Sequence, residues 1–180
     1  LETGRFLLDV GNYYNGTFHI NNVTGPDEYT AVVDDNYYTN SMAKYHFENI
    51  VDFYKHHKNS LSHLQVESTE IKEFIKAASL MRLVFDKHLN IYAQDDSFLR
   101  KAALDFTKLP KDKFPLILHY HPLFIYKHQV LKQADTMLAL MLLDFDDNKI
   151  LKDTFEYYEP ITTHDSSLSK CIYSIMSFRL

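Results

Sequence analysis

The sequence predicts a mainly α-helical protein, and three observations carry this prediction. Apolar residues recur at the 3.6-residue period of a helix along residues 36–58 and again along 68–88. Only four Gly and five Pro occur in 180 residues, fewer than the many tight turns of an all-β sandwich or barrel require. A composition with 46% hydrophobic and 24% charged residues is typical of a globular domain and excludes a disordered tail.

The first third of the chain is predicted to hold a helix end, a long loop and one complete helix. Residues 1–6 have the character of a helix interior without a start signal, so we expect the sequence to be a fragment of a longer chain. Residues 12–35 alternate loosely between apolar and polar, which predicts an ordered loop with a short hairpin. Residues 36–58 carry one apolar stripe that predicts a helix; it consists of Ala43, Phe47, Ile50, Val51 and Tyr54.

Three further helices are expected in the remaining sequence. The stripe in residues 68–88 predicts a helix with Ser68 or Thr69 as its N-cap. A polar connection over residues 93–120 should follow. Pro122 is expected to open a helix that runs to about Leu143, because Pro fits the first helical turn and the end of this segment is apolar nearly all round. The last helix should begin near Ser166.

Several classes of function are excluded by composition. A net charge of -5 without a basic run argues against nucleic-acid binding. The longest apolar run, 137–143, is too short to span a bilayer. The four glycines do not form a P-loop or a dinucleotide fingerprint. Cys171 is the single cysteine, which excludes an internal disulfide and fits a reducing compartment such as the cytoplasm.

No metal site is predicted either. His119, His121 and His128 lie close together, but no cysteine or carboxylate accompanies them at ligand spacing. Residues 144–148 imitate the start of a calcium-binding EF-hand loop. Lys149 stands where that loop needs Gly, so calcium binding is not expected.

A first polar motif, Val23–Tyr29, contains the sequence Gly-Pro-Asp-Glu. Gly25 and Pro26 predict a stiff turn that is followed at once by two carboxylates. Such a turn can project Glu28 into a pocket with the fixed geometry that a general acid needs. The alternative is an exposed acidic loop without chemistry.

A second motif, residues 126–135, opens the segment expected to form the most apolar helix. Lys132 and Asp135 would be buried there, and a buried charge is costly unless it is paired or used. Lys132 and Gln133 offer hydrogen-bond donors and an acceptor suited to sugar hydroxyl groups. The alternative is an internal Lys–Asp pair that holds helices together.

A third motif, residues 157–169, crowds hydroxyl groups and a histidine at a predicted helix start. Free backbone N–H groups, the helix dipole and serine hydroxyls together suit a phosphate or an oxyanion. The alternative is an elaborate helix cap, although one polar residue would suffice for a cap.

These motifs, together with residues 118–123, resemble those of glycoside hydrolase family 65, and they follow one another in the family's order. The resemblance implies that residues 1–180 form the later portion of an (α/α)6-barrel catalytic domain, without the β domains that flank the barrel in the family. It also implies an inverting disaccharide phosphorylase acting on maltose, trehalose, kojibiose or nigerose. The stretch from His119 to Gln133 is most similar to maltose phosphorylases.

The resemblance further implies a role for each candidate residue. Glu28 would be the general acid, and phosphate would attack C1 from the opposite face to give β-glucose 1-phosphate and a free sugar. A phosphorylase needs no second carboxylate to activate water, because phosphate is already an anionic nucleophile. No metal or organic cofactor is implied, and the parent protein is expected to be a cytoplasmic homodimer. The remaining assignments are Lys132, Gln133 and Glu159 for sugar binding, and Ser166, Ser167 and His164 for phosphate binding.

Three other interpretations stay open at this point. A trehalose hydrolase of the same family would need a base where phosphate would bind. A helical interaction module without chemistry would not explain why the three motifs coexist. The fragment alone would be inactive, and part of a barrel would leave apolar helix faces uncovered.

Overall fold

The computed structural model describes residues 1–58 and 66–180, and its regular structure is mainly α-helical, as predicted. Within these ranges the helices are α1 (Glu2–Val10), α2 (Tyr37–His57), α3 (Ser68–Leu80), α4 (Pro122–Tyr126), α5 (Thr136–Leu142), α6 (Asn148–Tyr158) and α7 (Ser167–Arg179). The strands form three two-stranded pairs: β1 (Gly11–Tyr14) with β2 (Thr17–Ile20), β3 (Phe85–Asp86) with β4 (Ile91–Tyr92), and β5 (Ala102–Ala103) with β6 (His128–Gln129). The first two pairs are antiparallel and the third is parallel. Single turns of 3₁₀ helix lie between residues 98 and 118 and at Glu159–Ile161.

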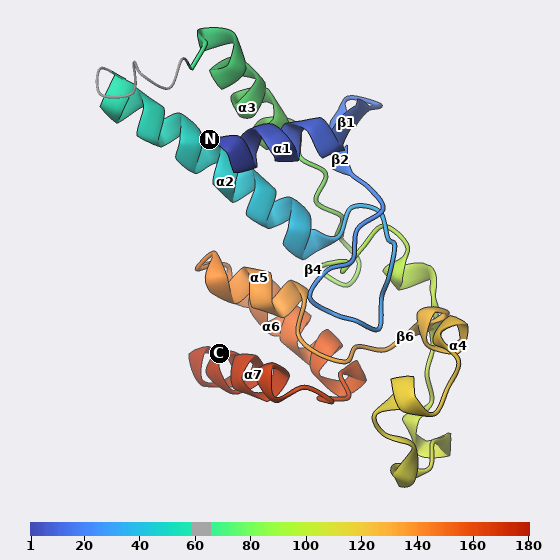
Figure 1. Ribbon diagram of the computed structural model, residues 1–180. Helices are drawn as coiled ribbons and strands as arrows, with labels where there is room; N and C mark the ends of the chain where they lie inside the picture. The colour runs from blue at the N-terminus through green and yellow to red at the C-terminus, as the bar shows by residue number, and fades with distance from the viewer. Residues whose placement is uncertain (59–65) are drawn as a thin grey trace.

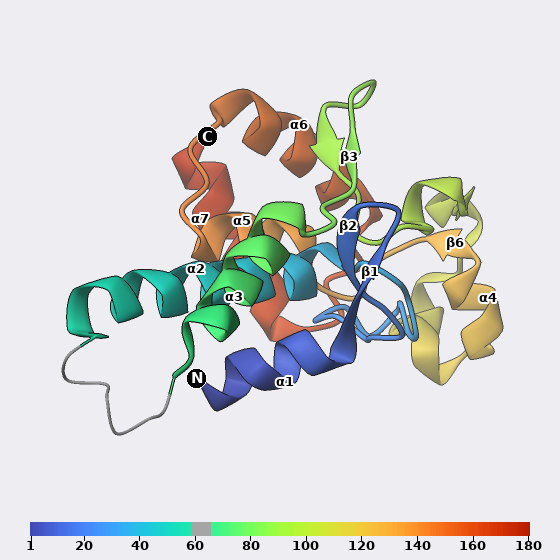
Figure 2. The ribbon, with the colours of Figure 1, turned by 90° about the horizontal axis from the view of Figure 1, so that it is seen from above.

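The helices form two groups, which Figure 1 shows above and below one another. One group holds α1, α2 and α3 together with the β1–β2 hairpin, around a core that includes Phe18, Phe47 and Phe74. The other holds α5, α6 and α7, around a core that includes Leu140. Because Tyr37 at the start of α2 belongs to this second core, α2 joins the two groups. The view from above shows α2 running beneath α3 toward α5 (Figure 2).

The prediction for α2 is confirmed, and its ends have clear causes. The side chain of Asn36 caps the helix by accepting a hydrogen bond of 2.9 Å from the backbone N–H of Thr39. Its last turn carries Lys55, His56 and His57, and basic groups at this end complement the negative end of the helix dipole.

The predicted helix over 68–88 is too long. The helix α3 ends at Leu80, and its N-cap is Glu67 rather than Ser68 or Thr69. Met81 then leaves the helix and forms a parallel bridge with Phe18 of β2. The following residues pair as β3 and β4, so a tertiary contact stops the helix before its apolar pattern ends.

The predicted helix from Pro122 to about Leu143 is wrong in its middle part. Two short helices, α4 and α5, stand at its ends, and residues 127–135 between them are not helical. The backbone N–H of Leu131 donates to the carbonyl oxygen of Ile161 at 2.9 Å, and the N–H of Thr163 donates back to Leu131 at 2.7 Å. These long-range hydrogen bonds replace the local ones that a continuous helix would make.

Residues 144–148 lead into α6, a helix that is not predicted from the sequence. Asp147 caps α6 by accepting hydrogen bonds from the N–H groups of Lys149 and Ile150, both at 3.0 Å. The acidic run that imitates a calcium loop is thus the N-terminal cap of α6. The short hairpin predicted within residues 12–35 is present as β1–β2, although it begins at Gly11.

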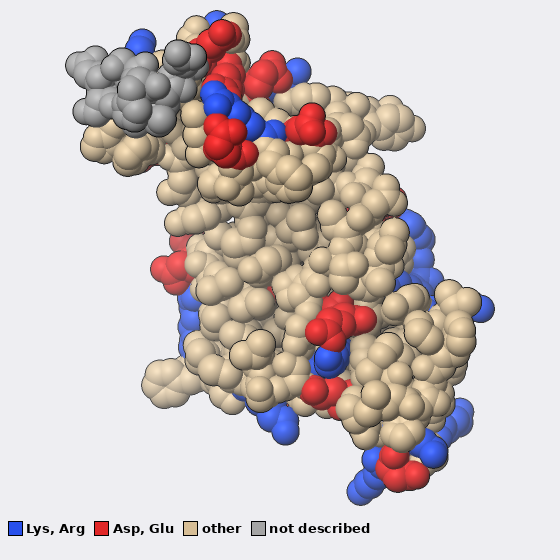
Figure 3. All heavy atoms as spheres, viewed as in Figure 1, with Lys and Arg blue, Asp and Glu red and all other residues tan. Residues whose placement is uncertain are grey.

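The surface keeps exposed apolar side chains on the helices, as expected for part of a barrel. On α7, Leu168 is 69% exposed and Phe178 is 96% exposed. The space-filling view shows a largely uncharged face that is interrupted by separate clusters of charged groups, one of them over α1 (Figure 3). Among the residues that the structure describes, no helix has the length and hydropathy needed to cross a membrane.

Candidate active site

The first motif lies in a loop, residues 21–36, whose two ends are joined. The N–H of Asp35 donates to the carbonyl oxygen of Ile20 at 3.0 Å. Val23 and Val33 exchange two backbone hydrogen bonds, both of 2.9 Å. The loop is therefore closed at its base, and its Gly-Pro turn points toward the segment that precedes α5 (Figure 1).

Asp27 anchors this turn in the interior. It is fully buried, and burial raises its pKa. One carboxylate oxygen accepts from the backbone N–H of Lys132 at 2.8 Å and from that of Tyr29 at 3.2 Å. The other accepts from the Thr30 hydroxyl at 2.8 Å and from the Gln94 amide at 3.0 Å. Asp27 thus holds the turn of Glu28 against the backbone of Lys132.

A second buried carboxylate, Asp135, supports the same turn. Its oxygens accept from the Asn36 side chain at 3.1 Å, and one of them accepts from the backbone N–H of Asp27 at 3.4 Å. A Cβ atom at Gly25 would lie 2.4 Å from Asp135 and 2.5 Å from Asn36. Glycine is therefore required at this position, because the backbone passes directly over the two side chains.

Glu28 and Lys132, the candidate acid and sugar-binding residues, meet at the surface of this network. Their side chains form an ion pair, with Glu28 62% and Lys132 20% exposed. The amide of Gln133 donates to the carbonyl oxygen of Pro26 in the same turn. The alternative of an internal pair between Lys132 and Asp135 is wrong, since Lys132 pairs with Glu28 and Asp135 with Asn36.

The third motif runs beside the second. The backbone pairing of Leu131 with residues 161–163 places residues 162–167 next to the segment of Lys132. Asp165 accepts from the buried Tyr29 hydroxyl and from Thr163, both at 2.7 Å. The fold therefore links all three motifs. The contacts of the first motif with the other two join residues 104 to 136 positions apart in the chain, so they form only when the chain folds.

His164 has a strained backbone conformation within the third motif. Its backbone has φ of 54°, a left-handed conformation that is uncommon for any residue other than Gly. The Ser169 hydroxyl accepts from the N–H of Ala134 at 3.2 Å and lies 3.0 Å from Nδ1 of His164. With Nδ1 accepting the Ser169 proton, the other ring nitrogen, Nε2, carries a proton that it can donate. Burial lowers the pKa of His164, so the neutral ring is favoured.

Ser166 and Ser167 stand at the start of α7. Ser166 occupies the N-cap position, but its side chain makes no capping hydrogen bond. Glu159 lies on the preceding turn and lines a hollow of about 350 Å³ together with His164 and Lys170. Within the described ranges, no hydrogen bond or ion pair joins Glu159 to Glu28 or Lys132.

The residues that support the site are not among the candidates that the sequence predicts. The motif itself could have indicated Asp27, which directly precedes Glu28. Asp135 also stands in a motif, but the apolar pattern around it predicts a buried helix. No sequence pattern indicates Gln94, because its partner Asp27 lies 67 positions away in the chain.

The buried carboxylates make stability depend on pH. Burial, with the charge of Asp27 as the next cause, raises the pKa of Asp135 from 3.8 to about 8. The folded protein therefore holds a proton that the unfolded chain releases above about pH 4. We expect the free energy of unfolding to fall as pH rises from about 4 to 8, by up to ~1.4 kcal/mol per unit. Asp135→Asn cannot ionise and should flatten this slope in denaturant titrations; an unchanged slope would contradict the assignment.

Two of the three clustered histidines make structural hydrogen bonds. His121 caps α4 by accepting from the N–H of Leu123 at 3.2 Å, and Nδ1 of His128 lies 2.7 Å from the carbonyl oxygen of Phe124. Among the described residues, no group of three or more His, Cys, Asp or Glu side chains is arranged to hold a metal ion.

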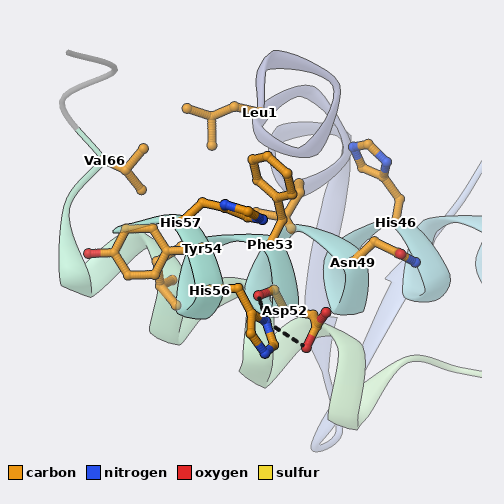
Figure 4. Close-up of a pocket in the computed structure, with 11 residues that line it drawn as sticks. Leu1, His46, Asn49, Asp52, Phe53, Tyr54, His56, His57 and Val66 are labelled. Atoms are coloured by element: carbon orange, nitrogen blue, oxygen red, sulfur yellow. Dashed lines mark hydrogen bonds and ion pairs between the residues drawn. The ribbon is translucent and has the colours of Figure 1, made fainter. Parts of the chain in front are cut away.

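Another hollow, of about 520 Å³, lies along α2 beside Leu1 (Figure 4). The rings of Phe53 and His57 from α2 project toward it, beneath Leu1. None of the candidate active-site residues lines this hollow.

The comparisons with known proteins identify the class to which this helical domain belongs. The model of the glycosyl hydrolase family 65 central catalytic domain matches residues 1–180. The chain therefore belongs to glycoside hydrolase family 65.

Curated relatives include several phosphorylases. The chain is 49% identical to an α,α-trehalose phosphorylase of Geobacillus stearothermophilus, over 100% of this chain and 25% of that protein. It is 46% identical to an α,α-trehalose phosphorylase of Thermoanaerobacter brockii, over 98% of this chain and 24% of that protein. It is 30% identical to the maltose phosphorylase of Bacillus subtilis, over 100% of this chain and 24% of that protein. The chain thus spans about a quarter of the length of these relatives.

A solved structure confirms the fold. The structure described as "Putative kojibiose phosphorylase from human microbiome" matches with a TM-score of 0.90 and 28% identity, over 99% of this chain and 26% of that chain. The mainly α fold is therefore that of part of a family 65 helical barrel.

Proposed function

We propose that this chain carries the acid and the phosphate-binding segment of an inverting phosphorylase that cleaves an α-linked glucose disaccharide, with α,α-trehalose as its substrate. The observation that carries the proposal is the ion pair of Glu28 with Lys132, linked through Tyr29 and Asp165 to the start of α7. The motif between His119 and Gln133 favours maltose. The higher identity to trehalose phosphorylases, 49% and 46% against 30% for a maltose phosphorylase, supports trehalose instead.

In this proposal Glu28 gives its proton to the glycosidic oxygen as the bond from that oxygen to C1 breaks. A phosphate oxygen attacks C1 from the opposite face, which inverts the configuration and yields β-glucose 1-phosphate and glucose. We expect bound sugar to draw the ammonium group of Lys132 onto its hydroxyls, which frees the Glu28 carboxyl to face the glycosidic oxygen. Gln133 would bind sugar through the side-chain oxygen that its hydrogen bond to Pro26 leaves free.

The phosphate would bind at the start of α7. The hydroxyls of Ser166 and Ser167, the free N–H groups of the first helical turn and Nε2 of a neutral His164 are all potential donors. Lys170 adds a positive charge in the hollow that His164 lines. The family resemblance implies that Glu159 contacts the acceptor sugar. Phosphate supplies the nucleophile, so we expect no metal or organic cofactor; a homodimeric, cytoplasmic protein remains our prediction for the parent.

Substrate choice is tested with the whole protein and phosphate. Purified protein is incubated with trehalose, maltose, kojibiose or nigerose, and glucose 1-phosphate release is measured. We expect kcat/KM to be highest for trehalose. A higher kcat/KM for maltose would show that maltose is the substrate, as the sequence motifs predict. The protein would still be a phosphorylase.

Replacing Ser166 and Ser167 with Ala tests the phosphate site. Each hydrogen bond lost to a charged oxygen should weaken binding by a factor of roughly 10–150, so the apparent KM for phosphate should rise strongly and that for the disaccharide much less. Because the side chain of Ser166 makes no capping bond, the melting temperature should change little. Earlier melting with an unchanged phosphate KM would show that the two serines only cap the helix.

A further inference from the structure

We propose that a hollow beside the β1–β2 hairpin binds a neutral saccharide, at a site separate from the candidate active site. The hollow has a volume of about 520 Å³, which lies within the usual range of small-molecule sites. Its lining comes from the hairpin, from the base of the loop 21–36 and from the turns that follow α3 and β4. None of the candidate active-site residues lines it.

The floor of the hollow is rigid because its polar groups are already paired. The ring of His19 lies between Thr17 and Asp35, with Nε2 at 2.6 Å from the Thr17 hydroxyl and Nδ1 at 2.7 Å from the Asp35 carboxylate. The second oxygen of Asp35 accepts from the Asn40 side chain at 3.1 Å. Ligand recognition therefore falls to the side chains around this floor.

Carboxylates and a guanidinium group stand side by side around the floor. Asp34 uses one oxygen to accept from the N–H of Asn22 at 3.0 Å, which leaves its other oxygen available. Among the residues that the structure describes, the guanidinium group of Arg82 makes one long contact, of 3.4 Å, with Asp96. The partly exposed amides of Asn21 and the turn residue Asn15 complete the polar lining.

The charges of these groups select the chemistry of the ligand. The lining holds three carboxylates, of Asp34, Asp35 and Asp96, against Arg82 and His19, and Arg100 pairs with Asp96 from beside the hollow at 3.5 Å. Positive charge is therefore not in excess, which disfavours phosphate and sugar phosphates, whereas Arg82 disfavours an organic cation. Hydroxyl groups both donate and accept, so a polyhydroxyl ligand can pair with the carboxylates and the guanidinium group at once.

Tyr14 provides an apolar surface on the rim of the hollow. Its side chain is 64% exposed, and its ring meets the ring of His19 edge-on at 6.1 Å. An exposed tyrosine combines an apolar ring with a hydroxyl group, which suits the mixed apolar and polar faces of a sugar ring. Tyr13 points to the opposite face of the strand, where its hydroxyl lies 3.5 Å from Glu73.

This geometry offers a matched pair of variants. The test titrates the whole protein with maltotriose by calorimetry, in a Lys132→Ala background that weakens binding at the candidate active site. We expect Tyr14→Ala and Asp34→Asn each to weaken the remaining binding by roughly tenfold or more, and Tyr13→Ala to leave it unchanged. Asn at position 34 keeps an oxygen for the N–H of Asn22, and unchanged melting temperatures would show that the variants are folded.

Three results would overturn the proposal. They are the loss of all maltotriose binding in the Lys132→Ala background, equal binding by the Tyr14 and Tyr13 variants, and tighter binding of glucose 1-phosphate or spermidine than of maltotriose at this site. The test measures binding without turnover, so it does not depend on whether the protein is a phosphorylase.

Discussion

Glu28→Gln is expected to reduce phosphorolysis by a factor of roughly 10²–10⁴, because glutamine keeps the shape of the side chain but cannot donate the proton to the leaving oxygen. The side chain is 62% exposed and makes its ion pair with Lys132 at the surface, so the change should leave the fold intact. The measurement is kcat for release of glucose 1-phosphate, together with the disaccharide KM, which should change little.

A matched control for this variant is Glu48→Gln. Glu48 is also an exposed carboxylate paired with a lysine, Lys44, but it lies on α2 away from the three motifs. Its replacement should leave kcat unchanged. Near-normal turnover by Glu28→Gln would remove Glu28 from the mechanism.

Asp27→Ala is expected to destabilise the protein by on the order of 3–5 kcal/mol. The change leaves four donors without their acceptor in a fully buried place: two backbone N–H groups, the Thr30 hydroxyl and the Gln94 amide. Each such donor costs about 1–3 kcal/mol, partly offset because burial of the carboxylate itself is unfavourable. Activity should also be lost, because the turn of Glu28 is no longer held against the backbone of Lys132.

The variant Asp27→Asn tests whether the hydrogen bonds of this side chain, rather than its charge, maintain stability and activity. The amide oxygen can accept from both backbone N–H groups, while the Thr30 hydroxyl and the Gln94 amide can each turn to accept instead of donate. Gln94 already has a buried side-chain oxygen without a partner in the described structure. We therefore expect Asp27→Asn to cost less than about 1.5 kcal/mol by chemical denaturation and to retain activity. Equal losses for Ala and Asn would contradict the positioning role.

The elements that sequence analysis predicted correctly are those with local causes. The helix α2 has its apolar stripe and its Asn36 cap within one segment, and α7 has a polar start followed by apolar spacing. Residues 122–143 carry an equally apolar pattern, yet they form two helices, because Leu131 pairs with residues 161–163. No local pattern reveals a hydrogen bond made 30 residues away.

The same distinction applies to the candidate site. Glu28, Lys132 and Ser166 stand in short motifs that mark them as unusual for a helical protein. Their support cannot be found in this way, because Asp27 is bonded to residues 67 to 108 positions away in the chain. The two carboxylates below the ion pair, Asp27 and Asp135, are buried only because the fold brings the motifs together.

The stereochemistry of the product tests the central proposal most directly. The whole protein is incubated with α,α-trehalose and inorganic phosphate, and the products are followed by proton and phosphorus NMR from the first turnovers. Inverting phosphorolysis predicts β-glucose 1-phosphate and glucose in equal amounts, with no cleavage when phosphate is omitted. Cleavage without phosphate that gives two glucose molecules, or formation of the α-phosphate, would contradict it.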